Sequence, residues 1–353
     1  MYKRIITRFL IFSLIAGASL YVERTERLHS PYTILKHYSS FEKEKDGYSV
    51  SFLRRYGLTF DGSIQSYLEK RMSHYKTGYI DVIMVDVKKK KMIAFYDRGG
   101  VFNKSLKAAS IFKVFTLIAG LSSDSIGPFD PVEYRGNPHS SNPEYWTNGR
   151  RRIKSLSDAF GESSNPAFAL LGEGVGEENI IETCRNLLLG TNIMDVVSGY
   201  INESTDVRLL APGLKGSYIS PLYASILASG IANDGVFFIP EIVSGTGYIS
   251  LGRLIDHDVA AWTRHISMGT VIDGTAKHYY KKLNIKIEMG GKTGSITGID
   301  PPGWYEWFVG WAPVDTPLVA VVVFAVHDSI KYFSPAEVGL YLMDRYLNSG
   351  VRH

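Results

Sequence analysis

The apolar positions of this chain follow two spacings, one typical of strands and one typical of helices. Residues 79–87 and 92–97 are rich in strand-forming side chains and are separated by four lysines, which predicts two antiparallel strands joined by a turn. Strand-like runs return near the other end of the chain, at 285–289, 307–311 and 318–326. In between, apolar residues recur every three or four positions, as in helices that bury one face. The pattern therefore predicts an α/β fold: an antiparallel sheet of N- and C-terminal strands, flanked by helices, with an inserted helical subdomain.

Capping residues and helix breakers indicate where the expected helices begin and end. Asp61 or Ser63 caps a helix that ends near 77–78, and Ser334 followed by Pro335 begins the last helix of the chain. The segment 121–150 is rich in proline and glycine and is expected to be mostly loop. Further helices are expected at 111–118, 155–160, 166–171, 177–189 and 220–233.

The first residues predict export from the cytoplasm. Lys3, Arg4 and Arg8 precede an apolar run of about 14 residues, the arrangement of a signal sequence or a short membrane anchor. We expect residues 1–24 to be a single anchor in the cell membrane, with the rest of the chain outside the cytoplasm, in the periplasm or at the cell surface. The alternative is a signal peptide cleaved at Ala16-Gly17-Ala18, which gives a secreted protein.

Composition sets the size of the folded part and excludes several kinds of site. Residues 25–56 are polar and charged and are expected to form a stalk, followed by a folded domain at 57–353. A net charge of +4 gives no reason to expect a nucleic-acid partner. The single cysteine, Cys184, rules out an intrachain disulfide. Because the chain has neither paired cysteines nor a His-Glu-x-x-His motif, we expect no metal and no cofactor.

The candidate nucleophile is Ser110, which precedes Lys113 by three positions and so lies on the same side of a helix. A serine hydroxyl needs a base, and a lysine serves as one only when burial or a second cation lowers its pKa. The apolar run at 111–118 supplies the burial. The same spacing occurs at Ser40 and Ser73, but in charged surroundings that keep the lysine hydrated and protonated.

Two later motifs supply partners for Ser110. Lys292-Thr293-Gly294 follows a strand-like run and is expected at the edge of a strand. The lysine adds positive charge near the nucleophile, and the threonine offers a hydroxyl to a substrate carboxylate. The glycine leaves room for a substrate to lie along the backbone. Ser163-Ser164-Asn165 lies between two expected helices that fix it at both ends, as a catalytic loop requires.

Both motifs have second copies that we interpret as structural. Lys76-Thr77-Gly78 ends a charged helix and is interpreted as its C-cap. Ser140-Ser141-Asn142 lies in the proline-rich loop and is interpreted as a surface turn. Tyr200 is an alternative base, although its neighbours suggest a polar loop.

In this order, the three motifs resemble those of the penicillin-binding transpeptidases and the related serine β-lactamases. Flanking stretches over about 57–348 narrow the resemblance to the transpeptidase domain of high-molecular-mass penicillin-binding proteins, in a form without a glycosyltransferase domain. Ala109 stands where the family commonly has glycine, Ser295 where it often has threonine, and no Glu-x-x-Leu-Asn pattern of a β-lactamase follows Asn165. The flanks that carry the resemblance are 58–65, 156–168, 220–235, 274–276 and 307–313.

The resemblance implies a serine D,D-transpeptidase that acts on the D-Ala-D-Ala ends of peptidoglycan stem peptides through an acyl-enzyme on Ser110, and that penicillin acylates in the same way. By this resemblance, residues 57–353 are the transpeptidase domain and β-lactams are its covalent inhibitors. The expected partners are the cytoplasmic membrane and other cell-wall synthesis proteins. A D,D-carboxypeptidase and a serine β-lactamase are alternatives, and a non-catalytic β-lactam sensor is a weaker one. The residues implied are Ser110, Lys113, Ser163 and Lys292 for catalysis, and Asn165, Thr293, Gly294 and Ser295 for substrate binding.

Overall fold

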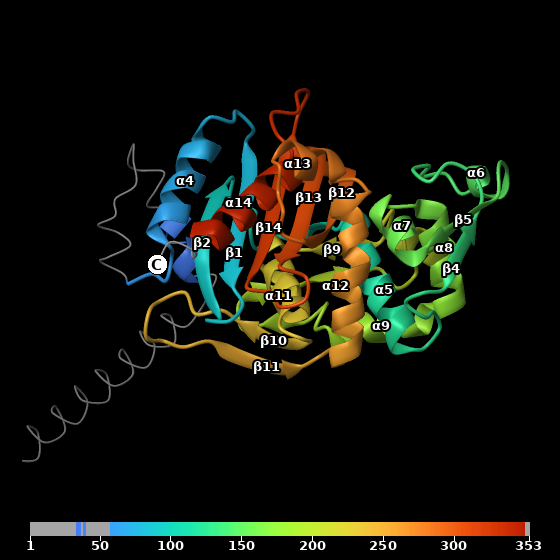
Figure 1. Cartoon of the computed structure of the whole chain (residues 1–353), viewed down its shortest axis with the longest axis horizontal. Helices are drawn as coiled ribbons and strands as arrows, with labels where there is room; N and C mark the ends of the chain where they lie inside the picture. The colour runs from blue at the N-terminus through green and yellow to red at the C-terminus, as the bar shows by residue number, and fades with distance from the viewer. Residues whose placement is uncertain (1–32, 37, 40–56, 350–353) are drawn as a thin grey trace, which may run out of the picture.

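The computed structural model of the chain (Figure 1) describes residues 33–36, 38–39 and 57–349. The expected anchor at 1–24 and nearly all of the expected stalk at 25–56 lie outside the described residues. Among the helices of the described part, none combines the length and the hydropathy of a membrane span.

A five-stranded antiparallel sheet forms the centre of the molecule, in the order β12-β13-β14-β1-β2. β1 pairs with β14, from Tyr79 opposite Val326 to Asp86 opposite Val319, so the two ends of the domain meet in one sheet. This arrangement confirms the predicted sheet of N- and C-terminal strands. The strands are β1 Tyr79–Asp86, β2 Lys91–Arg98, β12 Gly290–Ile299, β13 Pro302–Ala312 and β14 Val319–His327.

Helices cover both faces of the sheet (Figure 1). On one face, α4, α13 and α14 bury the apolar side chains of β13, β14 and β1. On the other face α11 is buried along its whole length, and α12 packs along β12. The bounds are α4 Gly62–Ser73, α11 Pro221–Ala232, α12 His257–Ile272, α13 Lys277–Lys282 and α14 Pro335–Ser349.

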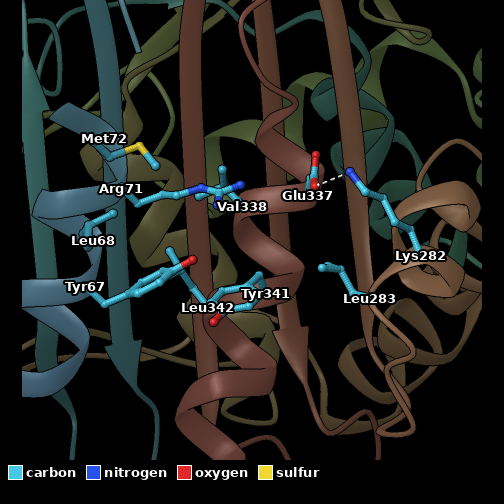
Figure 2. Close-up of a pocket in the computed structure, with 10 residues that line it drawn as sticks. All are labelled: Tyr67, Leu68, Arg71, Met72, Lys282, Leu283, Glu337, Val338, Tyr341 and Leu342. Atoms are coloured by element: carbon cyan, nitrogen blue, oxygen red, sulfur yellow. Dashed lines mark hydrogen bonds and ion pairs between the residues drawn. The ribbon is translucent and has the colours of Figure 1, made fainter. Parts of the chain in front are cut away.

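Figure 2 shows a groove of about 300 Å³ that α4, α13 and α14 leave on their face of the sheet. Lys282 Nζ lies 2.8 Å from Glu337 Oε1 and links α13 to α14. The ring of Tyr67 stacks on that of Tyr341, with centroids 5.0 Å apart, and links α4 to α14. These contacts hold the three helices together over the sheet.

α4 begins where the sequence predicts and ends earlier. Asp61 Oδ1 accepts hydrogen bonds from the backbone N–H groups of Ser63 and Ile64 at 3.0 and 2.9 Å, which confirms Asp61 as the cap. The helix ends at Ser73, however, so Lys76-Thr77-Gly78 is no helix C-cap. Thr77 is buried just before β1, and its hydroxyl donates to the carbonyl of Val326 on β14.

The strand predicted at 285–289 is wrong, because β12 begins at Gly290 and itself contains the Lys-Thr-Gly motif. Ile285 and Met289 are buried with the apolar residues of α13 and α14. The apolar pattern at 285–289 therefore reflects the burial of a loop that leads into β12, and this loop is not a strand.

The predicted helical subdomain follows the short strand β3, Leu106–Lys107, and packs beside β12. Segment 121–150, predicted to be mostly loop, also contains a strand and a short helix. β4 pairs with β5, from Pro131 opposite Ser155 to Tyr134 opposite Arg152, in an arm that projects at the end of the molecule away from α4 (Figure 1). The bounds are the 3-10 turn η1 Ala109–Phe112, α5 Lys113–Ser122, β4 Pro131–Tyr134, α6 Glu144–Thr147, β5 Arg152–Ser155, α7 Leu156–Gly161, α8 Asn165–Val175 and α9 Glu177–Asn186.

Short strands complete the fold around the Ser110 turn. β9 pairs with β3 on one side and with β8 on the other, in a small antiparallel sheet. The remaining bounds are β3 Leu106–Lys107, β6 Asn192–Ile193, β7 Val196–Val197, β8 Gly199–Ile201, α10 Val207–Leu210, β9 Ser217–Ile219, β10 Val236–Ile239 and β11 Ile249–Arg253.

Candidate active site

Ser110 lies in η1, the tight turn that leads into α5, and so just before the α-helix on which it was expected. Ala109 has a φ of 51°, in the left-handed region that glycine adopts most easily. Gly213 packs directly against this turn, because a Cβ at that position would lie 1.9 Å from the carbonyl oxygen of Ala109. The turn that presents Ser110 is therefore fixed by its neighbours.

Lys113 is fully buried and hydrogen-bonds with three oxygen atoms. Its Nζ lies 2.9 Å from Ser110 Oγ, 2.8 Å from Asn165 Oδ1 and 2.8 Å from the carbonyl oxygen of Pro212. Burial lowers the pKa of Lys113 well below its usual value, and repulsion from Lys292 lowers it further.

Three oxygen partners fit either charge state of Lys113, and burial together with Lys292 favours the neutral amine. A neutral lysine has two N–H bonds and one lone pair. The oxygens of Asn165 and Pro212 accept no more than those two hydrogens, which leaves the lone pair directed at the hydroxyl of Ser110. Lys113 in this state is placed to take the proton of Ser110.

Lys292 contacts the second motif. Its Nζ donates to Ser163 Oγ and to the carbonyl oxygen of Thr293, both at 2.9 Å. Lys292 is fully buried, 5.4 Å from the ring centre of Phe160, and burial lowers its pKa to about 7. Ser163 has a φ of 60° and lies between α7 and α8, as predicted. The hydroxyl of Ser163 is thus held beside a cation that titrates near neutral pH.

Asn165 joins the site to the projecting arm. Its Oδ1 accepts from Lys113, its Nδ2 donates to the carbonyl oxygen of Ser140 at 3.2 Å, and its backbone N–H donates to the carbonyl oxygen of Pro138 at 2.7 Å. Both ends of the side-chain amide, expected to hold the substrate, are therefore engaged by the protein here. The Ser140 turn, interpreted as a surface feature, lies against the site.

β12 is one of the two edge strands of the central sheet and borders the Ser110 turn. A Cβ at Gly294 would lie 3.2 Å from the backbone nitrogen of Ile111 and 3.3 Å from the Cβ of Ala109. The space that we expected Gly294 to leave for substrate is thus filled by the Ser110 turn itself. Ser295 is exposed, two residues beyond Thr293 and so on the same side of the strand.

Thr275 was noted only as a flank of the motif, but its hydroxyl lies 2.6 Å from that of Thr293. The turn that carries it is pinned, because Thr275 donates its backbone N–H to the carbonyl oxygen of Gly161 at 3.1 Å. A Cβ at Gly274 would lie 2.1 Å from the same oxygen. The sequence analysis also did not predict the contact of Pro212, because Pro212 contributes a backbone carbonyl and its side chain gives no signal of that role.

The alternative candidates do not converge on this cluster. Ser73 is exposed at the end of α4, and Ser40 lies outside the described residues. Tyr200 stacks on Tyr218 with centroids 4.5 Å apart, and burial raises its pKa, which makes it a poor base. Cys184 is buried, and burial raises the pKa of its thiol, so it is not a reactive nucleophile.

Curated relatives are distant and longer than this chain. Stage V sporulation protein D of Bacillus subtilis is 21% identical over 319 residues, covering 75% of this chain and 48% of the relative. Peptidoglycan D,D-transpeptidase PbpA of Mycobacterium tuberculosis is 25% identical over 246 residues, covering 61% of this chain and 48% of the relative. The chain thus spans about half the length of the curated relatives it matches.

Solved structures share the fold. Penicillin Binding Protein 2X from Streptococcus thermophilus aligns with a TM-score of 0.67 at 15% identity, covering 83% of this chain and 52% of that one. The D,D-transpeptidase domain of a peptidoglycan glycosyltransferase from Eggerthella lenta aligns with a TM-score of 0.65 at 19% identity, covering 83% of each chain. The family model of the penicillin binding protein transpeptidase domain matches residues 70–337, which include every residue of the Ser110 cluster. The chain therefore belongs to the penicillin-binding protein transpeptidase family.

Proposed function

We propose that this protein is a serine D,D-transpeptidase that forms an acyl-enzyme on Ser110 with the D-Ala-D-Ala end of a peptidoglycan stem peptide, and that it binds penicillin. The single observation that carries this proposal is the hydrogen bonding of Lys113. Its Nζ lies 2.9 Å from Ser110 Oγ, and its other two partners are Asn165 Oδ1 and the carbonyl oxygen of Pro212. Burial and Lys292 lower its pKa, which favours the neutral amine that takes the proton of Ser110.

The proposed reaction assigns a role to each residue. Ser110 Oγ attacks the carbonyl carbon between the two D-alanines as Lys113 takes its proton. The backbone N–H groups of Ser110 and Ser295 hold the developing oxyanion, an interaction worth about 3 kcal/mol. Ser163 passes a proton from Lys292 to the amine of the departing D-alanine as the carbon–nitrogen bond breaks. An incoming amine then takes the acyl group, giving its proton back through Ser163 to Lys292, while Lys113 returns its proton to Ser110.

Substrate binding is proposed for the outer strand. Because β12 is a sheet edge, an extended peptide is able to lie along it. Thr293 and Ser295 bind the terminal carboxylate of the peptide, near the positive charge of Lys292. Gly294 contributes by letting β12 approach the Ser110 turn.

The surroundings of the cluster favour a transpeptidase over a β-lactamase. Within the described part of the chain, no carboxylate hydrogen-bonds to Ser110, Lys113, Ser163 or Lys292. A group that would activate water for fast deacylation is therefore not in contact with the nucleophile.

Labelling with a fluorescent penicillin tests the nucleophile. Ser110→Ala should abolish labelling, whereas Ser73→Ala, which alters an exposed serine of the same spacing, should leave it unchanged. Lys292→Ala should weaken labelling strongly and Lys76→Ala should not. Full labelling of Ser110→Ala would overturn the proposal.

Product analysis then separates the enzymatic alternatives. On a pentapeptide ending in D-Ala-D-Ala, supplied with an acceptor amine, a transpeptidase yields cross-linked product and a carboxypeptidase mainly the trimmed peptide. Rapid hydrolysis of nitrocefin would instead identify a β-lactamase.

We further propose that residues 1–24 anchor the protein in the cell membrane with the domain outside the cytoplasm. Protease accessibility in spheroplasts, with and without lysis, tests this placement.

A further inference from the structure

The arm beside the active site is strongly basic. Between residues 135 and 154 the sequence has five lysines or arginines and a single acidic residue, Glu144. Folding brings this segment around an open hollow of about 680 Å³, next to the Ser140 turn (the arm is at the far end of the molecule in Figure 1). The hollow is lined by two arginines, a tyrosine and two asparagines, namely Arg150, Arg152, Tyr145, Asn137 and Asn148.

The three consecutive arginines of the arm differ in what they bind. Arg151 is paired with Glu133, with Nε to Oε1 and Nη2 to Oε2 both at 2.5 Å. Arg150 and Arg152 line the hollow, and neither has an ion pair or a side-chain hydrogen bond with any described residue. Glu144 does not line the hollow and accepts a hydrogen bond from Asn142. The hollow thus holds two guanidinium groups with no carboxylate partner.

The hollow has a defined shape. Gly136 has a φ of 82°, and a Cβ there would lie 1.9 Å from the carbonyl oxygen of Tyr145, so only glycine allows the two sides of the arm to close. The indole of Trp146 donates to the carbonyl oxygen of Ser140 at 3.0 Å, which ties α6 to the turn.

The same carbonyl connects the hollow to the nucleophile. Ser140 accepts from Asn165 Nδ2 at 3.2 Å, and Asn165 Oδ1 accepts from Lys113, the partner of Ser110. Three hydrogen bonds, through Lys113 and Asn165, thus connect the Ser140 turn beside the hollow with Ser110.

We infer that this hollow binds a free carboxylate of the peptidoglycan stem peptide, away from the terminal alanines, through Arg150 and Arg152. The inference rests on the proposed function and extends its substrate site. Two guanidinium groups match the geometry of a carboxylate. Tyr145, 62% exposed, offers a ring against which the carbon skeleton of the peptide packs. The phosphate groups of an anionic wall polymer carry the same negative charge as a carboxylate, and the experiment below distinguishes these two ligands.

The test compares two soluble substrates that both end in D-Ala-D-Ala and differ in one internal carboxyl group, free in one and amidated in the other. The full wild-type chain should give a higher kcat/KM for the free acid, and the preference should fall as salt is added. Arg150→Gln/Arg152→Gln should reduce the preference on the order of tenfold, since two exposed charge contacts are lost. Arg151→Gln, which removes an equal charge already paired with Glu133, should retain it.

Penicillin labelling in parallel keeps this inference separate from the proposed function. If the wild type is not labelled at Ser110, the proposed function itself fails and this inference with it. If all variants are labelled equally but the double variant keeps the full preference for the free acid, the inference alone is overturned. It is also overturned if the wild type shows no preference and inorganic polyphosphate inhibits it more than the double variant, because the hollow is then a phosphate site.

Discussion

Replacing Lys292 by methionine should stabilise the folded protein at neutral pH while strongly weakening acylation. Lys292 is fully buried, and burial lowers the pKa of its ammonium group from 10.5 to about 7. At pH 7 and below, the folded protein therefore holds a buried charge that the unfolded chain keeps in water. Methionine is similarly long and unbranched, and Phe160, 5.4 Å from the ammonium, provides an aromatic contact for its sulfur.

The size of the effect follows from proton linkage. Between about pH 7 and pH 10.5 the unfolded state binds more protons at this residue than the folded state, so wild-type stability rises with pH. Each pH unit contributes up to about 1.4 kcal/mol, which amounts to about 3 kcal/mol between pH 7 and pH 9.5. The variant also loses the hydrogen bonds to Ser163 and to the carbonyl of Thr293, at about 1 kcal/mol each. Relative to pH values above 10.5, where the side chain is neutral in both states, the full penalty at pH 7 is about 4 kcal/mol. After the loss of the two hydrogen bonds, the net stabilisation at pH 7 is about 2 kcal/mol.

Urea unfolding at pH 7 and pH 9.5, followed by tryptophan fluorescence, measures this difference. Lys292→Met should be more stable than the wild type at pH 7, and the gap should narrow at pH 9.5. Lys76→Met, at an exposed lysine, should match the wild type at both values. A variant that is less stable at pH 7, or that keeps the wild-type pH slope, would refute the buried-charge reasoning.

Three further predictions follow from the packing around the sheet and the site. Asp81 is fully buried opposite Asp97, and burial, followed by repulsion from Asp97, raises the pKa of Asp81. Its favourable contribution to stability is complete below about pH 3.8 and is lost as the pH rises through the raised pKa. In urea unfolding, Asp81→Asn should therefore be more stable than the wild type at pH 8 by about 1 to 2 kcal/mol, and its stability should depend less on pH. Thr275→Val should raise KM for a D-Ala-D-Ala peptide about fivefold with little change in kcat, because the hydroxyl that positions Thr293 is lost, and Thr275→Ser should restore it. Gly213→Ala should cost about 2 to 4 kcal/mol and abolish penicillin labelling through its clash with the Ala109 carbonyl, whereas Gly100→Ala, also at positive φ but with open space, should cost about 1 kcal/mol and keep labelling.

Most side chains of the site could be predicted from the sequence, because three motifs occur in order and each has a fitting local context, whereas Thr275 was noted only as a flank. Ser110 and Lys113 share a helical spacing within an apolar run, and Ser163 lies between two clearly capped helices. The backbone contributions could not be predicted. The carbonyls of Pro212 and Ser140 complete the hydrogen bonding of Lys113 and Asn165, and every residue has a carbonyl.

The same limit applies to the fold. Long β-branched runs such as β1 and β14 predicted that N- and C-terminal strands share the central sheet, since burial on both faces selects those side chains, but they did not predict the strand order. The paired strands β3, β8 and β9 have two or three residues each, too few to show a period. The residues at 285–289 alternate because they cover the core, and burial alone does not distinguish such a loop from a strand.

The most direct test of the central claim is mass mapping of the penicillin adduct. The full chain is incubated with penicillin, digested, and searched for the peptide that carries the acyl group. The account predicts a single adduct on Ser110, absent from Ser110→Ala. An adduct on Ser73, Ser163 or Tyr200, or acylation that persists in Ser110→Ala, would contradict it.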